Sequence, residues 1–162
     1  METYTLTFKN LDAALNAFID DFVSTYKSLL IRDNKKATGN LISSIKPLKI
    51  DFANNKMQGT IDIASYWKYV EYGRRPGKFP PINKILDWIK VKPVIPRPLN
   101  GLKPPTEAQL AFLISRKIAR DGINAGNQYE EALNISWTKN EKNISDSISK
   151  DLNQIIDLVT LL

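Results

Sequence analysis

The chain has 162 residues, of which 43% are hydrophobic, and it carries a net charge of +6 without any cysteine or histidine. This length suffices for one hydrophobic core of ordinary size without disulfide bonds. The missing residue types exclude thiol nucleophiles, metal sites built from Cys and His, and imidazole acid–base catalysis. Because no signal-peptide pattern opens the chain and no apolar run approaches the length of a membrane span, we expect a soluble protein made in the cytoplasm.

The first elements in the chain are predicted to be a strand and a long helix. Apolar and polar residues alternate over Thr3–Phe8, which predicts a short strand. Apolar residues then recur at spacings of three and four from Leu11 to Leu29, and Asn10 before them is a suitable N-cap. This pattern predicts an amphipathic helix that ends near Asn34, followed by a helical turn over Asn40–Ile45.

Two further strands are predicted to form a β-hairpin. Apolar and polar residues alternate over Pro47–Ala53 and again over Lys56–Ala64, and the Asn-Asn pair between them favours a turn. This period of two indicates that one face of the hairpin is buried and the other faces water. A short helix is predicted over Tyr66–Tyr72, with Gly73 as its C-terminal cap.

Prolines and glycines divide the next part of the chain. The sequence RRPGKFPP after Gly73 predicts an irregular loop that is mobile in the free protein, and an amphipathic helix is predicted over Ile82–Val91. The five prolines of residues 93–105 predict an extended loop. A capping box of Thr106 and Gln109 then begins another helix, which is predicted to end at Gly122.

The C-terminal region predicts one helix over Asn127–Trp137 and a second over residues 141–162. Apolar residues recur at spacings of three and four in the second helix, at Ile144, Ile148, Leu152, Ile155, Val159 and Leu162. An apolar stripe so close to a terminus requires a partner, which is either the first long helix or another subunit.

Together these elements predict an α+β fold in a single domain over residues 1–162. A small antiparallel sheet of Thr3–Phe8 and the hairpin is expected to pack against the long N-terminal helix and against the helix at residues 107–121. An extended Pro-rich loop and a C-terminal helix complete the predicted fold. Residues 1–140 would form the core, and the helix at 141–162 would dock either on the first long helix or on a neighbouring subunit.

The positive charge is concentrated between Ser65 and Lys103. This segment carries nine Lys and Arg but only two acidic residues, Glu71 and Asp87, whereas the rest of the chain sums to −1. Its mixture of aromatic rings and cations is typical of the energetic centres of protein interfaces, and equally of surfaces that bind single-stranded nucleic acid. A third interpretation is that many of the rings belong to the core. The candidate interface residues are Tyr66, Trp67, Tyr69, Glu71, Tyr72, Arg74, Arg75, Lys78 and Phe79.

The enzymatic interpretations rest on weaker patterns. The sequence GRRPGK at Gly73–Lys78 has three residues between its glycines and lacks a final Ser or Thr, so it does not match a Walker phosphate-binding loop. Asp62 and Glu71, with Lys68 or Lys78 beside them, could form a metal-dependent nuclease site, although no spacing fixes the two carboxylates relative to each other. We therefore assign no catalytic, metal-binding or cofactor-binding residue. A nuclease is the second alternative, after a basic nucleic-acid-binding module.

Two motifs and the order of the elements resemble a known family. The sequence TGNLISSI at Thr38–Ile45 follows the long helix, and ASYWKYVEYGRRPGKFPP at Ala64–Pro81 follows the hairpin. They are similar to the TG.L..SI element and the Y..YVE.G.R signature of the tail-completion and minor-tail-component family of tailed bacteriophages. The matching residues are Thr38, Gly39, Leu41, Ser44 and Ile45, and Tyr66, Tyr69, Val70, Glu71, Tyr72 and Gly73.

The resemblance covers about residues 10–90 and more loosely residues 106–135. The insert at Ile82–Lys103 and the C-terminal helix go beyond the compact members of that family. The composition, rich in Asn, Lys and Ile, looks more like the members found in crAss-like and other short-tailed phages.

The resemblance implies a non-enzymatic virion protein of the neck or upper tail, made in the host cytoplasm. Such a protein would form a ring of six or twelve copies between portal and tail. Its partners would be other copies of itself and the adjacent portal, neck or tail proteins, with no membrane and no cofactor. A ring needs head-to-tail contacts between two unlike surfaces, and the aromatic Arg-rich segment and the C-terminal helix are two such candidates. Whether the basic segment faces protein or passing DNA stays open.

Overall fold

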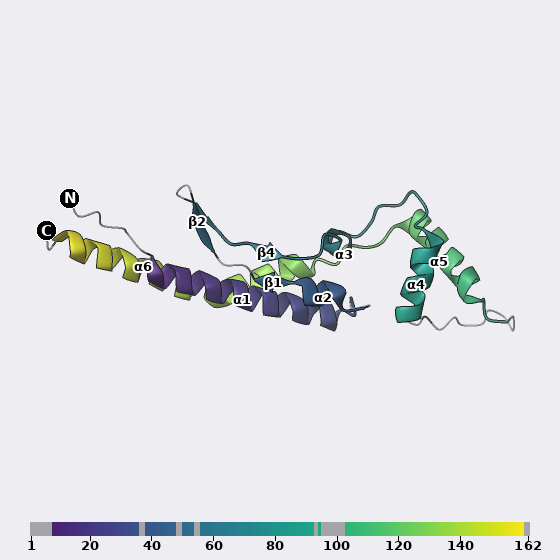
Figure 1. The fold of residues 1–162 in the computed structure, drawn as a ribbon, viewed down its shortest axis with the longest axis horizontal. Coiled ribbons are helices and arrows are strands. Elements are labelled where there is room, and N and C mark those ends of the chain that lie inside the picture. Colours follow the sequence, from purple (N-terminus) through teal and green to yellow (C-terminus); the bar gives the residue numbers. More distant parts are fainter. Residues whose placement is uncertain are drawn as a thin grey trace. The chain divides into compact units, whose positions relative to one another are not determined.

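The computed structural model describes residues 8–35, 38–47, 50–53, 56–92, 94 and 103–160, and the side chains at these positions except 51–53 and 56–57. The described residues are mostly helical, with short antiparallel strands, which confirms the α+β class (Figure 1). They group into two compact units, the first within residues 1–34, 42–63 and 128–162 and the second within residues 35–41 and 64–127. No helix in the described ranges is both long and apolar enough to cross a membrane.

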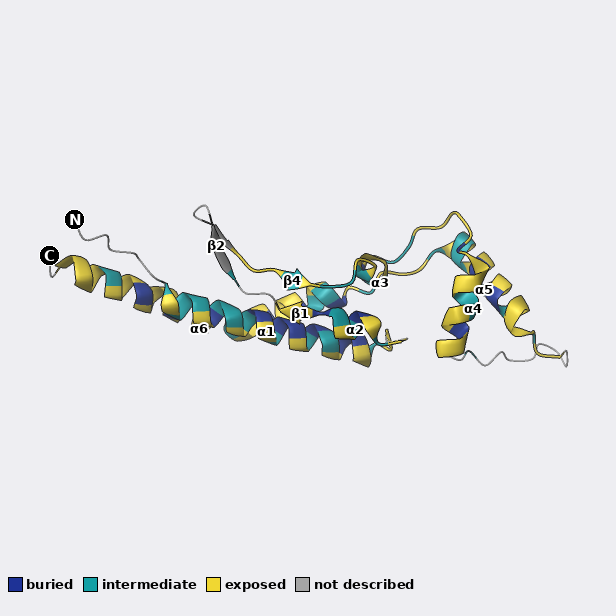
Figure 2. Cartoon of the chain, viewed as in Figure 1, coloured by how far each residue is buried: buried dark blue, intermediate teal, exposed yellow. Residues whose placement is uncertain are grey.

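Two long helices form the body of the first unit. Helices α1 (Lys9–Arg32) and α6 (Gln128–Thr160) lie side by side and run in opposite directions, with their buried residues on the facing sides (Figures 1 and 2). The residues that α1 buries are mostly large, such as Leu30, whereas α6 buries small residues such as Ala132 and Ser136. Small residues on one helix allow close approach of the other, so that the large side chains of α1 fill the interface.

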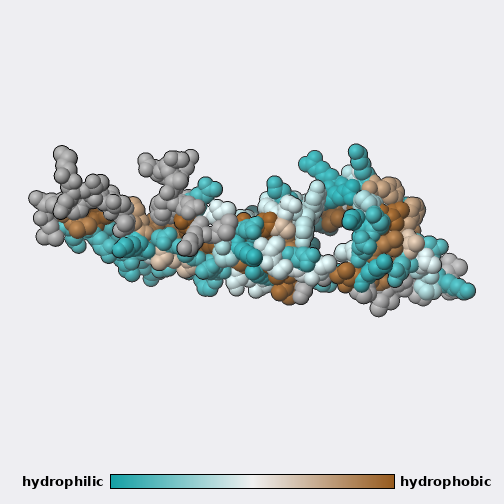
Figure 3. All heavy atoms as spheres, in the orientation of Figure 1, coloured by the Kyte–Doolittle hydropathy of each residue, from teal (hydrophilic) through white to brown (hydrophobic). Residues whose placement is uncertain are grey.

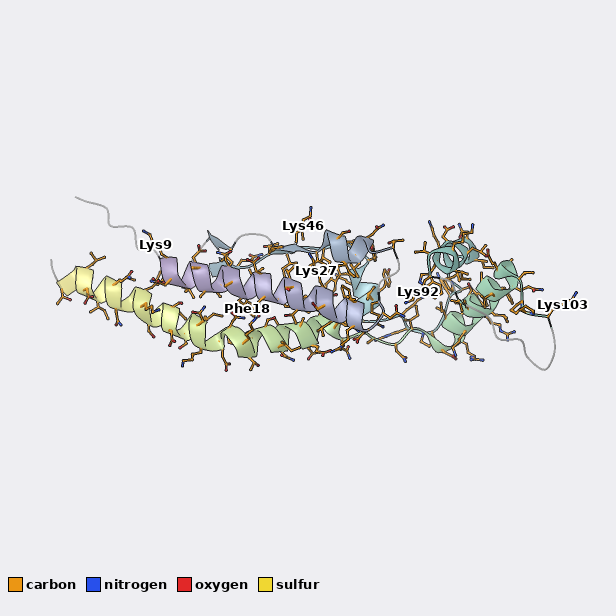
Figure 4. All side chains as sticks on the ribbon, turned by 90° about the horizontal axis from the view of Figure 1, so that it is seen from below. Lys9, Phe18, Lys27, Lys46, Lys92 and Lys103 are labelled. Atoms are coloured by element: carbon orange, nitrogen blue, oxygen red, sulfur yellow. The ribbon has the colours of Figure 1, made fainter. Side chains whose placement is uncertain are left out.

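Aromatic rings reinforce this interface near the start of α6. The ring of Tyr129 lies edge-on to Phe22 and Tyr26, with ring centres 5.0 and 5.7 Å away, and Phe22 stacks on Tyr26. Further along, Phe18 of α1, which is labelled in Figure 4, lies edge-on to Trp137 of α6 with ring centres 6.0 Å apart. Edge-on and stacked arrangements of this kind add roughly 0.5–1.5 kcal/mol per pair beyond the burial of apolar area.

The start of α1 is capped by the other helix rather than by its own sequence. The helix begins at Lys9, two residues before the predicted start, and its N-cap residue Phe8 offers no side-chain acceptor. Instead the Asp151 carboxylate accepts hydrogen bonds from the backbone N–H groups of Asn10 at 3.1 Å and Leu11 at 2.8 Å, and from Asn10 Nδ2 at 2.7 Å. Asn10 is therefore a donor to a distant cap and not the cap itself.

Burial and hydrogen bonding act in opposite directions on Asp151. Burial disfavours its charge, yet the hydrogen bonds from Leu11 and Asn10 lower its pKa below the ordinary value. The free N–H groups and the positive end of the helix dipole lie at this point of α1, so the carboxylate stabilises the helix in its ionised form.

Polar contacts also join the other end of α1 to α6. Gln128 Nε2 donates to Asp33 at 2.9 Å, and Arg32 forms paired hydrogen bonds with Asp33 and Glu131. The bonds from Arg32 lower the pKa of Glu131. Both ends of the helix pair are thus fixed in register by groups far apart in the sequence.

The predicted β-hairpin is confirmed as two short antiparallel ladders. Strands β1 (Lys46–Pro47) and β4 (Ile61–Asp62) pair with each other, as do β2 (Asp51–Ala53) and β3 (Lys56–Gln58). β1 also contacts α1. The strand predicted at Thr3–Phe8 lies outside the described residues except for Phe8, which precedes α1.

The second unit contains a helical hairpin. Helices α4 (Ile82–Val91) and α5 (Glu107–Asp121) pack against each other, α3 (Trp67–Glu71) precedes them, and α2 (Asn40–Ser44) spans the boundary between the units. The predicted capping box is present: Thr106 Oγ1 accepts from Gln109 N–H at 3.3 Å and Gln109 Oε1 accepts from Thr106 N–H at 3.0 Å. The predicted Pro-rich loop falls mainly outside the described residues.

Two expectations about the organisation of the fold do not match this arrangement. The sequence placed the helix at 107–121 over the sheet, but α5 packs on α4 within the second unit, whereas the strands belong to the first. The sequence also predicted two separate helices at Asn127–Trp137 and 141–162, but both belong to the continuous helix α6. Part of the C-terminal stripe is therefore covered by α1, as the buried Ile144 shows.

Candidate interaction surface

Backbone hydrogen bonds fix the segment that follows α3. Arg74 and Ile123 exchange two N–H···O bonds of 2.9 and 2.8 Å, and Gly77 N–H donates to Ala119 at 2.8 Å. On the other side, the Glu71 carbonyl accepts from Gly126 N–H at 2.7 Å. The loop predicted to be mobile is thus bound to the residues around the end of α5 by main-chain hydrogen bonds. Such bonds could not be predicted from the types of residue in the sequence.

Two glycines make this close approach of two backbones feasible. Gly73 has φ +67° and Gly122 has φ +77°, in the left-handed region that side chains disfavour. A Cβ on Gly73 would lie 2.1 Å from the carbonyl oxygen of Ile123, and one on Gly122 would lie 2.3 Å from that of Arg74. The predicted caps at Gly73 and Gly122 are confirmed, and each glycine also clears space for the other segment.

The fixed segment presents aromatic side chains to solvent. Tyr69 is 68% exposed and Tyr72 is 67% exposed, and the Tyr72 ring lies 5.9 Å from that of the half-buried Trp67. The interpretation that places these tyrosines in the core is therefore not supported. We call the exposed predicted residues the aromatic surface, which comprises Tyr66, Tyr69, Tyr72, Arg75, Lys78 and Phe79.

The remaining predicted interface residues have structural positions. Glu71 is only 2% exposed and its backbone carbonyl receives the bonds from Gly126 and Asn127. Arg74 is half-buried, and its guanidinium donates to the carbonyl oxygen of Lys78. These two residues form hydrogen bonds that fix the loop. The prediction that Glu71 lies at an interface is therefore corrected, since this residue is buried.

Sequence reasoning missed an apolar extension of this surface on α5. Phe79 stacks on Phe112 with ring centres 6.2 Å apart, and Phe112 and Leu113 are 46% and 43% exposed. An amphipathic helix normally buries its large apolar residues, but the fully buried residues of α5 are the small Ala111 and Ser115. Figure 3 shows brown, apolar surface over the α4–α5 hairpin beside teal, polar side chains.

The two units differ sharply in charge. The second unit contains fourteen Lys and Arg against four Asp and Glu, a net charge of +10, whereas the first contains nine against thirteen, a net charge of −4. In the second unit Glu71 is buried, and Asp121 is engaged by Arg120, whose hydrogen bonds lower the pKa of that carboxyl. Most cations of the second unit that the structure describes are exposed, and most of them form no ion pair among the described residues.

The two carboxylates considered for a nuclease belong to different units. Asp62 lies on β4 of the first unit, and Glu71 is buried in the second. Within the described ranges no group of three or more acidic residues could hold a metal ion.

Comparison with protein-family models, curated proteins and solved structures gives no match to this chain. The functional argument therefore depends on the surfaces of the chain itself: a fixed aromatic surface, its apolar extension on α5, and two units of opposite charge.

Proposed function

We propose that the chain is a structural protein of a tailed-bacteriophage neck or upper tail, where copies form a ring that joins the portal to the tail. The observation that carries this proposal is the aromatic surface, held on a hydrogen-bonded backbone frame. It supports the interface interpretation of the Y..YVE.G.R-like signature, since the tyrosines around the buried Glu71 point outward.

Such a surface is suited to protein association. Tyr and Arg dominate the energetic centres of interfaces because they combine large contact areas with hydrogen-bonding groups. Their backbone is already fixed by the bonds at Arg74 and Gly77, so less ordering is required on binding. Each fully covered aromatic side chain would contribute roughly 1.5–3 kcal/mol from apolar burial.

A ring also requires a second, unlike surface on each copy. The first unit supplies one: α6 carries exposed apolar residues along much of its length, including Trp137, Leu152 and Val159. Two unlike surfaces on one chain permit the head-to-tail contacts from which closed rings are built.

Inactivation of the gene in the producing phage tests this function. We expect filled heads and tails that are not joined, as seen by electron microscopy, with joined particles restored by the wild-type chain supplied in trans. The variant Tyr69→Ala/Tyr72→Ala should not restore joining. Ile31→Ala is the matched control, since it removes an exposed apolar side chain from α1, and it should restore joining fully.

Normal joined particles in the absence of the chain would refute the proposed function. Full restoration of joining by the double tyrosine variant would instead show that the aromatic surface is not needed for joining. It would not contradict the proposed neck function.

The charge of the second unit favours one other candidate, a nucleic-acid-binding module. A net charge of +10 beside exposed rings would bind phosphates and stack bases, with an affinity that falls steeply with salt. The variant that tests DNA binding is Arg75→Ala/Lys78→Ala. Arg74 is left unchanged because its side chain also hydrogen-bonds to the loop backbone. A loss of DNA binding in this variant without a loss of particle joining would favour the module.

A further inference from the structure

Two helix faces on this chain each combine exposed apolar residues with charged residues, and the two faces carry opposite charge. On α5, Phe112 and Leu113 are exposed, and Arg116 and Lys117 follow them one turn later on the same side. No ion pair in the described residues involves Arg116, and Lys117 reaches Asp121 only at 4.0 Å. We call these four residues the α5 face.

The second face runs along α6, next to the side that packs on α1. Trp137, Ile148 and Leu152 are 49%, 38% and 47% exposed and share this side of the helix. Glu130 and Glu141 lie on the same side, seven residues before and four residues after Trp137, and both are exposed. No ion pair among the described residues uses either glutamate. We call these five residues the α6 stripe.

We propose that the α5 face of one copy packs on the α6 stripe of a second copy. This inference rests on the proposed ring function and names its subunit contact. The basic, apolar face belongs to the unit with net charge +10, and the acidic, apolar stripe belongs to the unit with net charge −4. A second copy is therefore a partner whose charge complements each face.

The contact is head-to-tail, so each added copy leaves one free face of each kind. Association can then continue until a ring closes. The apolar residues at the centre supply burial, and the charges set the orientation and oppose the pairing of like faces. The association should weaken as salt screens the charges.

Charge reversal tests the contact in the full chain. By sedimentation velocity, we expect Arg116→Glu/Lys117→Glu to weaken self-association at least about tenfold, and Glu130→Lys/Glu141→Lys to do the same, because each change places like charges across the contact. An equimolar mixture of the two variants should associate again, since each then meets an opposite face. The chain that carries all four changes should also associate.

Matched controls make the same charge changes elsewhere. Lys84→Glu/Lys90→Glu alters exposed positions of α4 in the same unit, and Asp146→Lys/Asp157→Lys alters exposed positions on another side of α6. Both should associate as the wild type does, and circular dichroism should show native helix content for every variant.

Several results would overturn the contact. They are a wild-type chain that stays monomeric at every concentration, equal effects of the control variants, or no recovery in the mixture. Salt-sensitive binding of a DNA duplex that is lost in Arg116→Glu/Lys117→Glu would assign the α5 face to nucleic acid instead. Self-association insensitive to all four changes refutes this contact alone, whereas joined particles without the chain refute the neck function even if the charge exchange succeeds.

Discussion

Replacing Gly73 by Ala should release the loop that carries the aromatic surface. The new Cβ would lie 2.1 Å from the carbonyl oxygen of Ile123, far inside a normal contact, and the φ of +67° disfavours any side chain. The left-handed conformation alone costs about 1–2 kcal/mol. Relief of the clash must separate Arg74 from Ile123, and the loss of their two hydrogen bonds adds about 0.5–1.5 kcal/mol each. Together these give about 2–5 kcal/mol.

Amide hydrogen exchange measures this local opening directly. At about 1.4 kcal/mol per factor of ten, exchange of the amides of Arg74, Ile123 and Gly126 should accelerate between about 30-fold and a few thousand-fold. Gly77→Ala is the comparison, because Gly77 also has a positive φ, of +143°, but open space where its Cβ would stand. Gly77→Ala should accelerate the exchange of these amides less than Gly73→Ala does.

Unchanged exchange at these amides in Gly73→Ala would refute the reasoning, since it would mean that the close approach of the two backbones does not exclude a side chain at residue 73. Equal acceleration by Gly77→Ala would show that backbone strain alone, and not the close approach, accounts for the effect.

Three further predictions concern stability. Leu30→Ala, at a fully buried position, should lower the free energy of unfolding by about 2–5 kcal/mol in urea, whereas the exposed Ile31→Ala should change it by less than about 0.5 kcal/mol; equal effects would contradict the helix interface. The pKa of Asp151 is lowered in the folded state, so its contribution to stability is present above the ordinary Asp pKa of about 3.9 and is lost as the pH falls through the folded value. The difference in urea midpoint between the wild type and Asp151→Asn should therefore shrink on acidification. A difference that stays constant would argue against the cap. Thr106→Ala should cost about 0.5–2 kcal/mol and speed exchange of the Gln109 amide, and protection as in the wild type would contradict the capping box.

Features set by neighbouring residues could be predicted from the sequence. The capping box at Thr106, the glycine caps and the pairing of the hairpin strands depend on residues close in the sequence, and the structure confirms each. The cap of α1 could not be predicted in this way, because Asp151 is 141 residues from Asn10.

Burial on α5 was harder to predict for a different reason. The sequence pattern assumes that large apolar residues face the interior, but α5 places Ala111 and Ser115 there and leaves Phe112 and Leu113 exposed. Likewise, the composition of the aromatic segment left a protein interface, a nucleic-acid surface and core rings open, while the buried position of Glu71 depends on its fold. Apolar residues that are exposed together as a patch indicate a binding surface, whereas singly exposed apolar residues are ordinary.

Immunogold labelling of purified particles tests the central claim most directly. An antibody against this chain should label the junction between head and tail, in particles whose protein composition includes the chain. Label on the capsid or on the distal tail, or particles that lack the chain altogether, would contradict the claim that it joins portal to tail.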